Sequence, residues 1–327
     1  MTKKGWGFAL TILTFTFFLV VSSYAQTFPT KPIEIMCMLP PGSSMDLLAR
    51  VTAEVAPKYL GQPMVVINKP GAGGALAAMD VVNSKPDGYK LVTLSNNSFM
   101  STFHTQKLMF NPKQLIPMWS MIMFKTGMFI RGDAPWKSLE ELIDYARKNP
   151  DKVTWGHHGR GLSVQVAASL IFKRAGVQMI EVPHKGSAES MAALLGGHID
   201  VLTTSYATVT PHVKSGKIRP IVTYEGQRYK DHPEVPTATE LGYKDVENLS
   251  TYVGLYGHKD TPEPVKKVLS EALKKICEDP AFKTGIEKVG EEHRCENPEF
   301  AMEAIRRGEE VVIPILKELG IYVENKF

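Results

Sequence analysis

The chain has 327 residues, of which 43% are hydrophobic and 22% are charged, and its formal net charge at pH 7 is +4. This composition is typical of a globular protein with a sizeable core, and the length favours two domains. Since the sequence has no run or stripe of basic residues, we expect no nucleic-acid partner.

The N-terminus has the pattern of a signal peptide. Two lysines precede an apolar run from Trp6 to Val21, and Ser23 and Ala25 provide the small residues of a cleavage site. The run is shorter than the roughly 20 residues that a membrane-spanning helix needs. We therefore expect export to the periplasm, cleavage after Ala25 and a freely diffusing product. The alternative is that the apolar segment is not cleaved and anchors the protein in the membrane.

The first expected strand and turn set the pattern for the chain. Ile33 to Leu39 are mostly apolar, as in a strand that is buried on both faces, and a Pro-Pro-Gly turn ends at Gly42. Ser43 and Ser44 can each cap the helix that follows, and Ser43-x-x-Asp46 is close to a capping box. A helix N-terminus that follows a buried strand favours anion binding. An ordinary capped βα turn is the alternative.

The segments that follow alternate between strands and helices. Apolar spacings of three and four predict a first helix that runs to Leu60 and ends at Gly61. The next expected elements are a strand at 64–67, a helix at 75–83 and a strand at 89–94. This order predicts a parallel, doubly wound sheet, in which ligands bind outside the carboxyl ends of the strands. Gly73, and Asn97 in a polar loop at 95–98, follow such ends.

The motif of strand, glycine-rich turn, serine and helix recurs in the second half. A strand at 153–156 leads into the turn from His157 to Ser163, and a helix extends to Ala175. Two such units in two domains can face each other across a cleft. Other expected strands are 180–182, 199–202 and 218–223, with a strand pair or crossing segment at 115–130 and a return to the first domain near 254–257. Further helices are expected to begin at Ser138, Pro262 and Pro298, the last with a kink at Pro314.

Three cysteines lie in the exported part of the chain. Cys37, in the first expected strand, is interpreted as an inert core thiol. Cys277 and Cys295 can pair, because export permits disulfides, but the sequence leaves this pairing open.

The motifs that would indicate an enzyme are incomplete. The segment from Gly71 resembles a dinucleotide-binding fingerprint, but Leu76 replaces its last glycine. The sequence around Ser163 is close to a nucleophile elbow, but Gln165 stands where the sharp turn needs glycine. The adjacent imidazoles at 157 and 158 point apart on a regular element. We therefore expect no catalytic residue, no cofactor and no metal.

Anion recognition is the interpretation that remains. Arg160 lies among glycines just before a helix N-terminus, and a guanidinium group can bind a carboxylate through two hydrogen bonds. A solvated loop arginine is the alternative. His184 either lines a site or packs in the interior.

Five segments carry a family resemblance over nearly all of the exported part. They are Pro40-Pro41-Gly42 with Asp46, residues 69–74, residues 85–89, Lys185-Gly186-Ser187 with residues 194–200, and residues 233–237 with 240–242. In this order they resemble the periplasmic solute-binding receptors of the tripartite tricarboxylate transporter group, the Bug-type receptors. The resemblance implies an α/β, two-domain periplasmic-binding-protein fold of the Venus-flytrap kind (type II-like). Its ligand cleft between the domains would hold a carboxylate from both sides.

The sequence departs from this family at the expected site. Ser43 replaces a second glycine, the segment from His157 to Ser163 replaces a small serine-rich loop, and His184 replaces an aromatic residue. These changes add positive charge and imidazoles to the second domain. They suggest a dicarboxylic or aromatic acid as the ligand.

We therefore expect a monomeric receptor, not an enzyme, that binds a small carboxylate by domain closure and delivers it to the membrane subunits of the transporter. The first domain would comprise residues 26–124 and 252–327, and the second residues 125–251. The expected ligand-binding residues are Gly42, Ser43, Ser44, Asp46, Gly73, Asn97, His157, His158, Arg160, Ser163 and His184, although Asp46 is better suited to order its loop or a water. An exported serine hydrolase that uses Ser163 and a receptor that feeds a membrane sensor are the alternatives.

The expected cleavage gives the first test. Protein recovered from the periplasm should begin at Gln26, because the small residues that end at Ala25 fit the cleavage site. Intact mass measures this directly. A periplasmic chain that retains residues 1–25 would contradict the assignment.

Overall fold

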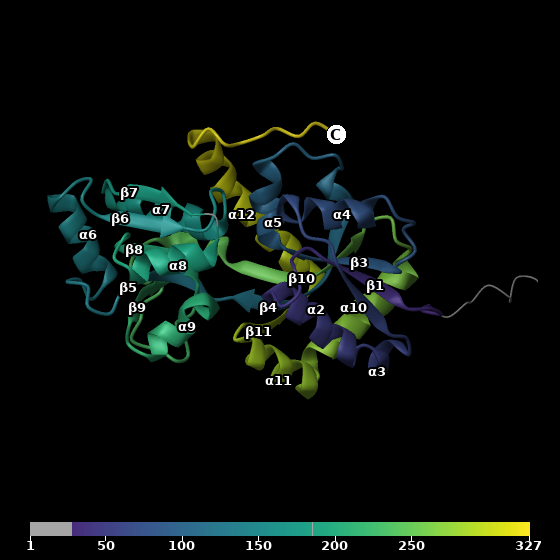
Figure 1. The fold of residues 1–327 in the computed structure, drawn as a ribbon. Coiled ribbons are helices and arrows are strands. Elements are labelled where there is room, and N and C mark those ends of the chain that lie inside the picture. The colour runs from purple at the N-terminus through teal and green to yellow at the C-terminus, as the bar shows by residue number, and fades with distance from the viewer. Residues whose placement is uncertain (1–27, 185) are drawn as a thin grey trace, which may run out of the picture.

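The chain forms two α/β lobes that lie side by side, each built on its own sheet (Figure 1). This computed structural model describes residues 28–184 and 186–327, so the expected signal peptide lies outside the described residues. The expected α/β architecture is confirmed, with one sheet in each lobe.

The first sheet has six strands in the order β11-β4-β10-β3-β1-β2. Their bounds are β1 Ile33–Cys37, β2 Met64–Asn68, β3 Lys90–Ser95, β4 Leu115–Phe124, β10 Thr251–His258 and β11 Glu292–Glu296. β1 pairs in parallel with both β2 and β3, as expected, whereas the other pairs are antiparallel. The carboxyl ends of β1 and β3 therefore meet at one edge of the sheet.

Helices cover the first sheet, and the side chains of Ser43, Asp279 and Asn297 cap three of their starts. Their bounds are α2 Ser44–Val55, α3 Pro57–Leu60, α4 Ala75–Val82, α5 Asn96–Met100, α10 Glu263–Glu278, α11 Pro280–Val289 and α12 Pro298–Glu318. The first helix was expected to run unbroken to Leu60. It instead ends at Val55, and Pro57, which has no N–H to donate, begins the separate turn α3.

The second sheet has five strands in the order β7-β6-β8-β5-β9. Their bounds are β5 Thr126–Arg131, β6 Thr154–His157, β7 Ile180–Pro183, β8 Val201–Ser205 and β9 Ile218–Thr223, and the helices are α6 Leu139–Lys148, α7 Ser163–Ala175, α8 Ser187–Leu195 and α9 Tyr206–Lys214. β6 pairs in parallel with β7 and β8. The motif around β1 thus recurs around β6, as the sequence predicts.

The loop expected at 95–98 is the one clear error of element type. These residues begin α5, and every side chain from Asn96 to Met100 is buried. Polar residues normally indicate a surface loop, but here Asn96 is buried and its side chain is hydrogen-bonded to the backbone. Its side-chain amide donates to the carbonyl of Ser250 (2.9 Å) and accepts from the N–H of Tyr252 (3.0 Å).

Two neighbouring connections between the sheets cross from one lobe to the other. The segment at 115–130 is a crossing, since β4 belongs to the first sheet and β5 to the second, and η5 (Lys244–Leu249) precedes the return into β10. α12 spans the two lobes in Figure 1, and its residues Val312 and Leu316 pack in the core of the second lobe. The domain boundaries near residues 124 and 252 stay a prediction, and α12, which was placed in the first domain, extends into the second lobe.

Two further features concern the cysteines and the apolarity of the helices. Cys277 of α10 and Cys295 of β11 form a disulfide, which decides the pairing that the sequence left open, and Cys37 is a buried free thiol in β1. Among residues 28–184 and 186–327, no helix has the length and apolarity needed to cross a bilayer.

The return strand gives a stability test. A Cβ added at Gly254 would overlap the backbone carbonyl of Trp119 on the neighbouring strand β4, which cannot move as a flexible side chain can. We expect Gly254→Ala to lower the free energy of unfolding by about 1–3 kcal/mol. Urea denaturation measures this, with Gly186→Ala as the control, because a Cβ at Gly186 meets nothing within 4 Å. Equal stability of both variants would contradict the packing seen here.

Candidate functional site

A cavity of about 490 Å³ lies where the two lobes meet. Its walls come from the carboxyl ends of parallel strands β1, β3, β6 and β8 and from the helix starts that follow them. The residues that line it include Ser43, Ser44, Gly73, Asn97, His158, Ser163, Ser187, Thr208, Thr251 and Glu291. This is the position in which open α/β sheets bind ligands.

The N-terminus of α2 forms the first wall. Ser43 is its N-cap, and the Ser43 hydroxyl accepts from the N–H of Asp46 (3.3 Å) and donates to the carbonyl of Pro40 (2.8 Å). Ser44 donates its hydroxyl to the carboxylate of Glu291 (3.0 Å). The helix start favours negative charge in the cavity.

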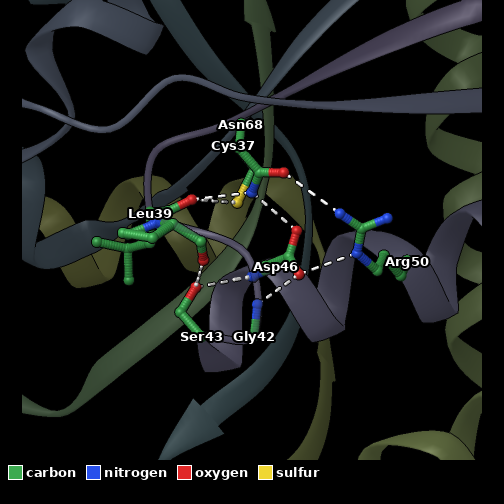
Figure 2. A network of polar contacts seen from close by, with 8 residues as sticks. Cys37, Leu39, Gly42, Ser43, Asp46, Arg50 and Asn68 are labelled. Atoms are coloured by element: carbon green, nitrogen blue, oxygen red, sulfur yellow. Dashed lines mark hydrogen bonds and ion pairs between the residues drawn. The ribbon is translucent and has the colours of Figure 1, made fainter.

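Asp46 orders the turn before α2 and does not line the cavity. Figure 2 shows its carboxylate accepting from the N–H of Gly42 (2.9 Å), Nε of Arg50 (2.9 Å) and Nδ2 of Asn68 (2.8 Å), and the side chain is 1% exposed. Burial opposes ionisation, but these three hydrogen bonds outweigh it, so the pKa of Asp46 lies below its ordinary value. This agrees with the loop-ordering role that the sequence favoured.

The N-terminus of α7 forms the opposite wall. The N–H of Ser163 donates to the side-chain oxygen of Asn97 (3.1 Å), and the Ser163 hydroxyl lies 2.9 Å from that of Thr251. Asn97 belongs to α5 and Thr251 to β10, so these contacts join the second lobe to the first. The two helix starts therefore face one shared cavity.

Arg160 and His157 are held outside this cavity by Glu181 of β7. A carboxylate oxygen of Glu181 lies 2.8 Å from Nε2 of His157, and the other accepts from Arg160 (3.2 Å). The hydrogen bond from His157 is the main reason that the pKa of Glu181 is lowered. The Arg160 side chain is 55% exposed and already has an acidic partner. The structure thus does not bring Arg160 and His157 to the lining of the cavity.

Of the two other histidines in the predicted site, one lines the cavity. His158 lines the cavity, and burial, with a smaller contribution from His157, lowers its pKa to about 4, so it is neutral at physiological pH. His184 packs beside Gly156 of β6 and is not among the lining residues. Gly42 also lies behind the lining, where its N–H serves Asp46.

Glu291 is a lining residue that sequence reasoning missed. It follows α11, and its side chain is buried, with one carboxylate oxygen bonded to Ser44 and the other without a hydrogen-bond partner among the described residues. Burial raises its pKa to about 7. Only the fold brings it to the α2 N-terminus, because 247 residues separate it from Ser44.

A larger cavity of about 740 Å³ lies elsewhere, between α7 and the end of α12. Its lining includes Trp155, Phe172 and Ile315 and includes none of the strand ends or helix starts that face the first cavity. We therefore take the cavity between the lobes as the candidate site.

Residues 48–321 match the family model described as "Tripartite tricarboxylate transporter family receptor". The chain belongs to this receptor family. It is 33% identical over 302 residues to the "UPF0065 protein in gbd 5'region" of Cupriavidus necator, which covers 91% of this chain and 90% of that protein. The resemblance stated from the five sequence segments is confirmed.

Solved structures of the family share the receptor's fold. A TctC solute binding protein from Polaromonas, without ligand, is 30% identical, has a TM-score of 0.78, and the match covers 89% of this chain and all of that one. MatC from Rhodopseudomonas palustris with bound malate is 26% identical, with a TM-score of 0.68 and coverage of 87% and 100%. Family and structural neighbours are solute-binding receptors and not enzymes, which confirms that expectation.

The Asp46 network gives a pH-dependent test. Asp46→Asn should lower the free energy of unfolding at pH 7 by about 1–3 kcal/mol, because it weakens buried hydrogen bonds to a charged group, while exposure of Arg50 limits the loss. The folded-state pKa is below 3.8, so this contribution is present above the unfolded pKa and is lost as pH falls through the folded pKa.

Urea denaturation of the wild type and of Asp46→Asn at pH 7 and pH 3 measures how much of the stability difference between them is lost at low pH. The control is Asp80→Asn, which removes the ion-pair partner of Lys69 and should cost less than about 1 kcal/mol, because Asp80 is 31% exposed whereas Asp46 is buried. Equal effects of the two substitutions at pH 7 would contradict an ordering role for Asp46.

Proposed function

We propose that this receptor binds a small carboxylate in the cavity between its lobes. The observation that carries the proposal is the meeting of two helix N-termini, those of α2 and α7, at opposite walls of one cavity. Each helix start carries a partial positive charge, and its first N–H groups have no partner inside the helix. The family neighbour MatC, which has bound malate, supports a ligand of this class.

We expect Ser43 and Ser44 to bind one end of the ligand and Ser163 the other. Gly73, Asn97 and His158 would complete the lining. The dicarboxylic or aromatic class predicted from the sequence relied on Arg160 as a second anion site. With Arg160 paired to Glu181, a second carboxylate would depend on the N-terminus of α7 instead.

Domain closure is the expected mechanism. The two crossings near residues 124 and 252 would act as the hinge, and a ligand that contacts both walls shifts the population toward the closed form. In this proposal the closed, periplasmic receptor is recognised by the membrane subunits of a tripartite tricarboxylate-type transporter. Membership of the receptor family supports this partner.

Two substitutions test the site. Thr208→Trp should lower the affinity for a carboxylate by at least about 30-fold, because Thr208 lies on α9 at the cavity wall and an indole would occupy ligand space. Arg160→Ala should change affinity less than about threefold, because the side chain is exposed and paired outside the cavity.

A thermal-shift screen of mono- and dicarboxylates would select the ligand, and calorimetry would measure both variants. Circular dichroism would check that the variants fold. If Thr208→Trp binds like the wild type, the cavity is not the site. If Arg160→Ala loses more than about tenfold, Arg160 is the anchor that the sequence predicted.

A further inference from the structure

We propose that Glu291 binds the ammonium group of the ligand, so that the receptor takes an α-amino acid in preference to a carboxylic acid that lacks the amino group. This inference rests on the proposed function, since it adds a second contact to the same ligand. It concerns the lining residue that the carboxylate-binding role does not use.

The position of Glu291 is unfavourable unless something pairs with it. The side chain is 5% exposed, lines the cavity and has one carboxylate oxygen, Oε2, buried without a hydrogen-bond partner among the described residues. A buried acceptor without a donor costs free energy, and such groups are rare in folded proteins. A donor on the ligand would satisfy it.

The surroundings of Glu291 define which donor fits. Its other oxygen, Oε1, accepts from the hydroxyl of Ser44, the first residue of α2. A carboxylate held at this helix start would therefore lie next to a site for a cation. An α-amino acid carries both groups on adjacent atoms, so one end of the ligand satisfies the helix N-terminus and Glu291 together.

Charge in the cavity points the same way. Of the described residues that line it, His158 and Glu291 are the titratable ones, and His158 is neutral. Lys125, at the first crossing, favours ionisation of Glu291, whereas Glu225, after β9, opposes it. Burial has the largest effect and raises the pKa of Glu291 to about 7. A ligand cation at Oε2 would favour the ionised form.

The opposite reading is that Glu291 stays protonated and donates a hydrogen bond to a ligand carboxylate. It makes a different prediction for pH. Binding to an ionised Glu291 should strengthen as pH rises from 5.5 to 8, whereas binding to a protonated Glu291 should weaken over the same range.

Matched acids test the proposal on the wild-type protein. Calorimetric titrations would compare succinate, L-malate and L-aspartate, then glutarate with L-glutamate, 4-methylpentanoate with L-leucine, and 3-phenylpropionate with L-phenylalanine. In the series that binds, the amino acid should bind at least about 30-fold more tightly than the acid without a substituent. Its affinity should rise with pH.

Glu291→Gln isolates the charge, because it keeps the shape and an oxygen that can accept from Ser44. It should lower affinity for the amino acid at least about 30-fold, change affinity for the unsubstituted acid less than about threefold, and remove the pH dependence. The matched control is Glu287→Gln, which removes an exposed carboxylate from α11 and should leave every affinity within about twofold.

Three results would overturn the inference while leaving carboxylate binding intact. The first is an unsubstituted acid that binds as tightly as its amino acid. The second is an equal loss for both acids in Glu291→Gln, which would indicate a structural role through Ser44. The third is affinity for the unsubstituted acid that falls with pH in the wild type alone. If no acid of the panel binds, the proposed function falls as well.

Discussion

The architecture of the site depends on one constraint, which is that a parallel strand must pass through a turn into a helix at the same edge of the sheet as its parallel neighbours. β1 leads into α2, and β6 leads through the turn at 158–162 into α7. Each turn leaves backbone N–H groups of the helix start without partners inside the helix. When two sheets bring these edges together, the donors face one cavity, and the preference for anions proposed for it rests on the backbone before any side chain is considered.

Side chains then hold the turns so that these donors stay in place. Asp46 is buried, ionised and bonded to three donors, one of which is the N–H of Gly42 in the turn itself. On the other wall, Glu181 of β7 likewise fixes the turn before α7, because its carboxylate bonds to His157 and Arg160. Both walls therefore use an acidic residue behind the lining to fix a turn in front of it. Negative charge close to an anion site is acceptable here because each carboxylate already has a positive or N–H partner.

Local patterns in the sequence predicted most of the fold. Apolar runs, capping residues and Gly-Pro breaks are local signals, and they placed β1, the start of α2 and the turn before α7 correctly. They failed where long-range contacts decide. Asn96 and Asn97 look like loop residues until the fold gives their amides partners at Ser250, Tyr252 and Ser163. β11 has the polar sequence Glu-His-Arg-Cys-Glu, without the alternation of a strand, and owes its conformation to pairing with β4.

The candidate site was predicted less well, for the same reason. The chain has 38 basic residues, and sequence cannot tell an arginine that meets a ligand from one that meets Glu181. Three of the predicted residues belong to the motif of strand, turn and helix, and they do line the cavity: Ser43, Ser44 and Ser163. The backbone of a βα turn fixes where they lie. Glu291 belongs to no recognisable motif, and no local sequence pattern can predict its contact with Ser44, because the two residues are far apart in the sequence.

Two buried glutamates near the crossings, Glu225 and Glu291, differ in how the protein satisfies their carboxylates. Burial raises the pKa of both Glu225 and Glu291 from 4.5 to about 7, a cost on the order of 3 kcal/mol each at high pH. Because both pKa values are raised, the stability that they contribute is present below about pH 4.5 and is lost as pH rises through about 7.

Their surroundings differ in what offsets this cost. Glu225 accepts from the N–H and hydroxyl of Thr126 and from the hydroxyl of Thr223, so its bonds tie the start of β5 to the end of β9 at the first crossing. Glu291 lines the cavity, with one oxygen bonded to the hydroxyl of Ser44 and the other buried without a hydrogen-bond partner among the described residues. The first carboxylate is therefore stabilised by the fold itself. The second retains an unmet hydrogen-bonding need at the place where a ligand can meet it, and a fold that tolerates such a group at a site does so at the expense of its own stability.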